Sequence, residues 1–163
     1  MATSSDNLRT YPECYSLTNM AAHVGRTFGP GAPQLIDQGR IQMFADATGD
    51  QQWLHTDVER AKRESPFGGP IAHGYLTLSL IAAEQIAIGI YPSDASGIMN
   101  YGINKVRFLA PVPAGATVTL SATLLEVTEK SEGRWLLRVS NTINLTDSGK
   151  PAVIAETLGM VFA

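Results

Sequence analysis

Residues 71–89 read IAHGYLTLSLIAAEQIAIG. From Leu76 to Ile88 the apolar side chains leave almost no polar face. A helix that is apolar nearly all round is usually a buried helix, and Gly89 suits its C-terminal end. The segment therefore predicts a helix enclosed by the rest of the fold.

The sequence that follows this segment changes to a period of two, which is typical of strands. Apolar and polar side chains alternate after Gly102, most clearly around the apolar positions Val118, Leu120, Ala122 and Leu124. The phase slips at Leu124-Leu125, which predicts a bulge. Residues 147–150 predict a hairpin turn, and consecutive strands joined by short turns favour antiparallel pairing.

Together these patterns predict an α+β hot-dog fold. In it a curved antiparallel sheet of about five strands, one of them near the N-terminus, wraps around the buried central helix. A length of 163 residues suits one domain over 1–163, with residues 1–10 as a flexible tail. Upstream of the central helix, Asp37 can cap a short helix that stops at Gly49, and Asp57 can cap a second one through Arg63.

The composition is that of a globular protein, with 44% hydrophobic and 17% charged residues. The formal net charge of -3 argues against a nucleic-acid binder. Cys14 is the only cysteine, so neither an intramolecular disulfide nor a cysteine metal cluster can form within one chain. Residues 1–10 lack an apolar signal region, and the uncharged stretch 68–83 is too short and polar to span a bilayer. We therefore expect a cytoplasmic protein with no membrane partner.

Asp50 and His55 are the strongest candidates for chemistry, because they lie five residues apart just past a predicted helix end. Beyond the stop at Gly49 a loop can turn both side chains inward. A carboxylate and an imidazole that share one water suit general acid–base catalysis. The alternative is structural: Asp50 forms a turn and His55 is half-buried in a loop. The spacing alone leaves both open, because it is common by chance.

Gly74 opens the central helix, whose first turn has unpaired N–H groups and the positive end of the helix dipole. A glycine leaves its N–H open to a ligand, so this position predicts an oxyanion site for a thioester carbonyl. The alternative is that Gly74 permits close packing of helix and sheet while His73 caps or braces the loop.

These segments resemble the MaoC-like dehydratases and (R)-specific enoyl-CoA hydratases. The positions that match the family pattern are Thr48, Gly49, Asp50, Leu54, His55, Ile71, His73 and Gly74. Residues 106–112 are similar to a strand of the family. The sequence of residues 45–55 and 66–69 is most similar to the branch related to nodulation protein N. The resemblance covers roughly residues 25–163.

The resemblance implies reversible syn addition of water across a trans-2-enoyl thioester to give the (3R)-hydroxyacyl product. It assigns catalysis to Asp50 and His55 and the polarising N–H to Gly74, with no metal or other cofactor. The implied partner is an acyl-CoA or acyl carrier protein thioester. Because an open sheet edge invites association, we also expect a homodimer.

The sequence departs from the family pattern at Gln52 and Trp53, where asparagine and proline are usual. A serine that holds the carboxylate in some relatives corresponds to Ala82, and Ser79 lies about one turn earlier as a possible substitute. We also expect substrate contacts from Trp53 and His73.

Lys105 and Arg107 alternate on one predicted strand face and are candidates to bind CoA phosphates, although such residues are more often a solvated face. Leu76, Leu80 and Ile103 can line an acyl tunnel, although core packing is the commoner role.

Two other functions remain open. A hot-dog acyl-CoA thioesterase would attack the carbonyl carbon with water, and fold alone does not separate the two reactions. A non-catalytic acyl-CoA-binding module would need no acid–base pair. Convergence of Asp50 and His55 within reach of one water would favour the hydratase.

Overall fold

The structure is a computed structural model that describes residues 14–163, so the predicted tail at residues 1–10 lies outside the described residues. A 3-10 helix at Met20–His23 precedes the sheet. The helices are α1 (Gln38–Thr48), α2 (Trp53–Thr56), α3 (Val58–Glu64) and α4 (Gly74–Ala87). The strands are β1 (Thr27–Phe28), β2 (Gln34–Ile36), β3 (Gly97–Phe108), β4 (Ala116–Ser131), β5 (Arg134–Leu145) and β6 (Pro151–Phe162).

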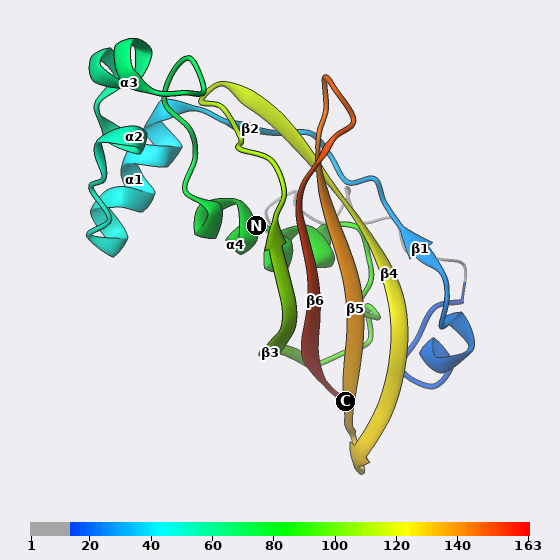
Figure 1. Cartoon of the computed structure of the whole chain (residues 1–163). Helices are drawn as coiled ribbons and strands as arrows, with labels where there is room; N and C mark the ends of the chain where they lie inside the picture. The colour runs from blue at the N-terminus through cyan, green and yellow to red at the C-terminus, as the bar shows by residue number, and fades with distance from the viewer. Residues whose placement is uncertain (1–13) are drawn as a thin grey trace, which may run out of the picture.

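The strands form one curved antiparallel sheet in the order β1-β4-β5-β6-β3, with β2 also paired to β4 (Figure 1). This confirms the predicted sheet, with six strands instead of about five. The difference arises at the N-terminal strand, which the Gly- and Pro-rich residues 29–33 divide into two short pieces on β4. Proline cannot donate to a strand ladder, so it breaks the pairing there.

Two local predictions within the sheet are confirmed. The register of β4 against β5 shifts between Leu124 and Glu126, which is the expected bulge. Residues 147–150 lie between the end of β5 and the start of β6. One boundary differs, because β3 already begins at Gly97 and not near Gly102.

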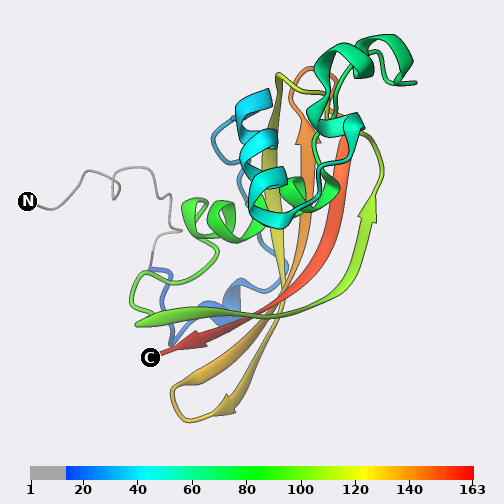
Figure 2. The same ribbon diagram turned by 90° about the vertical axis from the view of Figure 1, so that its left-hand side faces the viewer.

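Helix α4 lies against one side of the curved sheet and contacts β4, β5 and β6 (Figures 1 and 2). Its side chains Leu76 and Ile81 join a core formed with strand residues such as Val118, Leu120, Leu137, Val139 and Ile143. The predicted central helix is therefore confirmed.

The expectation that α4 is enclosed on all sides is wrong. Tyr75 is 70% exposed, and Ser79 and Ala83 are also exposed. The sheet covers only one face of the helix, and that face includes the polar residues Glu84 and Gln85. The C-cap is Ile88, one residue before the predicted Gly89.

The helices α1, α2 and α3 are grouped near the N-terminal end of α4, to one side of the long strands (Figure 1). Asp37 accepts a hydrogen bond from the Arg40 N–H at 2.7 Å, and Gly49 ends α1 in the left-handed conformation with φ of 80°, both as predicted. Asp57 caps α3 in the same way, and α3 ends at Glu64. Within residues 14–163 no helix is long and apolar enough to cross a membrane.

Candidate active site

The short helix α2 positions His55 between α1 and the segment that leads into α4. The Gln38 Nε2 donates to the His55 backbone carbonyl at 2.7 Å, which ties α2 to the start of α1. The Ile71 N–H donates to the Leu54 carbonyl at 3.2 Å, which ties α2 to the chain entering α4. These two bonds hold the His55 backbone from both sides. The sequence pattern predicts a loop at His55, whereas the structure has this helical turn.

Asp50, His55 and His73 converge in the structure. One side-chain nitrogen or oxygen from each residue lies within 4.8 Å of the other two. His55 and His73 are 8% and 2% exposed, whereas the Asp50 side chain is 55% exposed. Hydrogen bonds to a bridging water span roughly 2.6–3.2 Å each, so one water can contact two of these groups at this separation.

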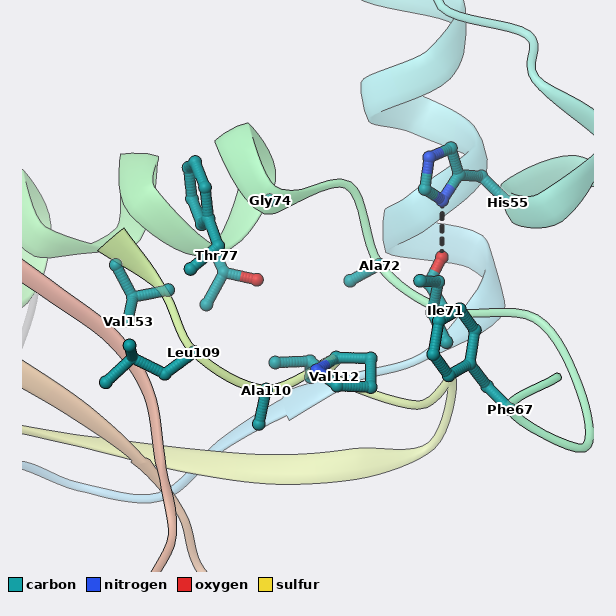
Figure 3. A pocket seen from close by; sticks show the side chains of 12 residues that line it. His55, Phe67, Ile71, Ala72, Gly74, Thr77, Leu109, Ala110, Val112 and Val153 are labelled. Atoms are coloured by element: carbon teal, nitrogen blue, oxygen red, sulfur yellow. Dashed lines mark hydrogen bonds between the residues drawn. The ribbon is translucent and has the colours of Figure 1, made fainter. Parts of the chain in front are cut away.

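The hydrogen bond of His55 fixes which ring nitrogen is free. His55 Nδ1 lies 2.7 Å from the Ile71 carbonyl oxygen (dashed line in Figure 3). A carbonyl oxygen only accepts, so Nδ1 carries the hydrogen of this bond. In the neutral ring Nε2 then carries a lone pair and can accept a proton.

His73 braces the loop that carries Asp50. Its Nε2 donates to the Asp50 backbone carbonyl at 2.9 Å. The His73 ring lies against the His55 ring with centroids 3.8 Å apart, and against the Phe44 ring at 5.0 Å. The carboxylate loop, the imidazole of α2 and the start of α4 are thereby held together as one unit.

The same three side chains are close enough to be considered as metal ligands. The two imidazole planes are inclined by only 30° in a stacked arrangement. Ring lone pairs lie in the ring planes, so stacked rings do not aim two nitrogens at one ion about 2.0–2.1 Å away. His55 Nδ1 is also engaged by the Ile71 carbonyl. The arrangement fits an acid–base pair with a bracing histidine better than a metal centre.

A cavity of about 250 Å³ is lined by both His55 and Gly74, at the start of α4, whereas Asp50 and His73 are not among its lining residues (Figure 3). The other lining side chains are mostly apolar and include Phe67, Phe108, Leu109, Val112 and Val153. Gly74 is the first residue of α4, where backbone N–H groups have no acceptor within the helix. A Cβ at this position would lie 3.0 Å from the Phe108 ring. The cavity thus combines a ring nitrogen, a free helix N-terminus and an apolar wall.

The other predicted site residues lie apart from this cavity. The Arg60 guanidinium lies 4.4 Å from the centroid of the Trp53 ring, and Trp53 is not among the residues that line the cavity. Ser79 lies on the exposed face of α4, where its Oγ donates to the Leu76 carbonyl at 2.7 Å. Lys105 and Arg107 line a separate hollow of about 230 Å³ on β3.

Two aromatic residues of the site were not singled out from the sequence. Phe108 packs on Gly74, and Phe44 packs on His73. Phe108 lies in the strand segment that resembles the family, but nothing in a single sequence pairs it with Gly74. The absence of a side chain at Gly74 was the available signal, since it implies a close neighbour.

With this fold and site, residues 19–144 match the protein family described as "MaoC like domain". That match covers more than half of the chain, so the protein belongs to the MaoC-like family. The predicted family is confirmed.

Individual relatives agree with this family and with the predicted hydro-lyase class. The chain is 41% identical over 143 residues to 3-hydroxyacyl-thioester dehydratase Z of Mycobacterium tuberculosis, covering 88% of this chain and 93% of the relative. It is 34% identical over 146 residues to nodulation protein N of Rhizobium leguminosarum bv. viciae, covering 90% and 91%. A solved (R)-hydratase from Pseudomonas aeruginosa is 28% identical, with a TM-score of 0.68 and coverage of 85% and 81%. The last similarity also supports the hot-dog fold.

Proposed function

We propose that this protein catalyses the reversible hydration of trans-2-enoyl thioesters to (3R)-hydroxyacyl thioesters, with Asp50 and His55 as the catalytic pair. The observation that carries the proposal is the convergence of these two side chains beside a cavity that also reaches Gly74. The dehydratase and (R)-hydratase names of its relatives support the same reaction.

In this mechanism a water lies between the Asp50 carboxyl group and His55 Nε2. One of the two groups starts without a proton and takes one from the water as its oxygen bonds to C3 of the substrate, and the other starts protonated and delivers its proton to C2. Because Nδ1 is bonded to the Ile71 carbonyl, Nε2 is the His55 nitrogen that exchanges a proton in this reaction. The sum of the two transfers is the addition of one water across the double bond.

The start of α4 supplies the other half of the mechanism. The Gly74 N–H, assisted by the helix dipole, donates to the thioester carbonyl oxygen. Negative charge develops on this oxygen when C3 is attacked, so the bond is strongest in the transition state. The apolar wall that includes Phe108 and Val112 keeps other water away from the enolate-like carbon.

The test is to add the purified protein to crotonyl-CoA and longer trans-2-enoyl-CoAs and to follow the loss of enoyl thioester absorbance. We expect hydration, with the (3R) enantiomer as the product on chiral chromatography. Release of free thiol without hydration would instead identify a thioesterase. Binding of the thioesters without either reaction would identify an acyl-CoA-binding module.

We also propose that the protein acts as a homodimer, joined along β3. Within residues 14–163, β3 pairs with β6 on one side and has no strand on the other. The unpaired edge carries large exposed apolar side chains, namely Ile98, Met99, Tyr101 and Ile103. An exposed apolar edge strand is a template for pairing with a second chain, and a twofold axis would make the contact self-complementary.

Replacing Met99 with lysine is expected to shift the protein from dimer to monomer. The lysine charge would lie against the same lysine of the second chain or against an apolar side chain of the interface. Sedimentation velocity at several concentrations measures the shift. Met43→Lys is the matched control, since Met43 is 66% exposed on α1, away from β3. A wild type that sediments as a monomer at all concentrations would contradict the proposal.

A further inference from the structure

A second cavity of about 450 Å³ lies between α4 and the strands β3 and β6. It adjoins the first cavity: Phe108 lines the first, Tyr75 lines the second, and their rings meet edge to face with centroids 5.9 Å apart. Its lining runs along α4 as far as Gln85, about three turns or 16 Å beyond Gly74. An acyl chain whose thioester is held at Gly74 would pass this pair of rings to enter the second cavity along the helix.

The far end of this cavity is polar, although an acyl chain is apolar. Gln85 and Thr157 line it, and both belong to a network that includes Asn141 and Tyr91. Gln85 and Asn141 are 2% and 1% exposed. Buried polar groups weaken a core unless their hydrogen bonds are made, so the direction of each bond matters.

Two backbone carbonyls fix the orientation of the Asn141 amide, and Asn141 in turn fixes that of Gln85. Asn141 Nδ2 donates to the carbonyls of Val139 and Ala155, both at 3.1 Å, so Asn141 Oδ1 must face Gln85. That oxygen accepts from Gln85 Nε2 at 2.7 Å, which turns Gln85 Oε1 toward the Tyr91 hydroxyl at 2.9 Å. Burial raises the pKa of Tyr91 to about 12, so its hydroxyl stays protonated and donates.

Thr157 is the place where this network ends. Its Oγ1 lies 3.0 Å from Gln85 Nε2 and 3.0 Å from Asn141 Nδ2, and both nitrogens can only donate. The two Asn141 Nδ2 hydrogens point at the Val139 and Ala155 carbonyls, so Oγ1 accepts from Gln85 Nε2. Neither amide nitrogen can accept the hydrogen of the Thr157 hydroxyl. Among residues 14–163 no acceptor takes that hydrogen, and Thr157 lines the cavity. The network therefore presents one donor at the far end of the cavity, whose other lining residues with polar groups include Tyr75, Ser79, Asn100 and Tyr101.

We propose that Thr157 is a specificity-determining residue whose hydroxyl donates to an oxygen atom on the distal part of the acyl chain. The preferred substrates are thus acyl thioesters that carry a hydroxyl or carbonyl oxygen near the chain end, in place of a plain methyl end. This inference rests on the proposed function, because it assumes that the acyl thioester is held at Gly74. A site built to bond a substrate oxygen discriminates against the analogue that lacks it, because a buried polar group is then left unpaired.

A purely structural role for the network does not account for the free donor. Gln85, Asn141 and Tyr91 bond to one another and to strand carbonyls, which links α4 to β5 and β6. Thr157 completes this link through its oxygen alone. The unused hydrogen contributes nothing to packing, and only a ligand or water in the cavity can accept it.

The test compares the binding of saturated acyl-CoA pairs of equal length, such as decanoyl-CoA and ω-hydroxydecanoyl-CoA, by calorimetry over a series of lengths. In the wild type the hydroxyl-ended chain is expected to bind more tightly than the methyl-ended chain at the length that reaches Thr157. Thr157→Val removes the donor at nearly constant shape and is expected to reduce this preference about tenfold. Thr157→Ser keeps the hydroxyl and is expected to keep the preference.

A wild type that binds the methyl-ended chain as well as the hydroxyl-ended chain at every length would overturn the inference, whether or not Thr157→Val folds. An unchanged preference in folded Thr157→Val would overturn it too. Either result would leave the proposed function intact if crotonyl-CoA is hydrated. Failure to bind any acyl-CoA would overturn the inference and the proposed function together.

Discussion

Replacing His55 or Asp50 with asparagine is expected to lower kcat/KM for enoyl-CoA hydration by about a hundredfold or more. Asparagine at position 55 places an amide near the former Nδ1, so it can still donate to the Ile71 carbonyl, but nothing replaces Nε2. Asparagine at position 50 keeps the shape of the carboxyl group but can neither take up nor release a proton. Each change thus deletes the proton-transfer group with little change in packing. Steady-state assays on trans-2-enoyl-CoAs measure the effect.

Matched controls separate catalysis from folding. Asp147→Asn is the control for Asp50→Asn, because Asp147 lies in an exposed turn between β5 and β6. His23→Asn is the control for His55→Asn, because His23 lies at the end of the 3-10 helix. Both are expected to retain wild-type rates. The double variant of Asp50 and His55 should lose about as much activity as the worse single variant, because groups that act as one unit are not additive. Full activity in a folded Asp50→Asn protein would show that the carboxylate is not required.

Sequence reasoning succeeded where the signal is local. Asp37 and Gly49 bound α1 as expected, since a cap depends on the residues beside it. The bulge at Leu124 is visible as a break in a two-residue period. Helix α2 has four residues, which is too few for any periodicity to show. The structure therefore adds the turn that orients His55.

Nonlocal partners account for the rest of the differences. Glu84 and Gln85 are polar, yet they are buried, whereas the aromatic Tyr75 is 70% exposed. The partners of Gln85 are Asn141 and Thr157, which are 56 and 72 positions away in the sequence, so no pattern within the helix predicts the burial. The candidate site also depends on contacts between residues that are distant in the sequence. The sequence pointed to Asp50 and His55, but the bond from His73 to the Asp50 carbonyl joins segments 23 residues apart.

Gly74→Pro is expected to lower kcat for hydration about a hundredfold beyond the effect of Gly74→Ala, because it removes the N–H that polarises the thioester carbonyl. Proline is well tolerated at the first residue of a helix, where its missing N–H has no helical acceptor. The preceding residue, His73, has φ of -58° and ψ of 136°, an extended conformation that suits a residue before proline. Helix α4 should therefore form in the variant.

Gly74→Ala is the essential comparison, since it keeps the N–H and adds only the Cβ. That Cβ would lie 3.0 Å from the Phe108 ring, so the ring must shift by a few tenths of an ångström and the cavity narrows. We expect a loss of about tenfold from this crowding, mostly in KM, whereas loss of the N–H should appear in kcat because the carbonyl charge develops in the transition state. Gly69→Ala, with open space around the added Cβ, should leave kcat and KM at their wild-type values. Equal kcat values for folded Gly74→Pro and Gly74→Ala would mean that this N–H takes no part in the reaction, and the helix N-terminus would then act on the substrate through its dipole or not at all.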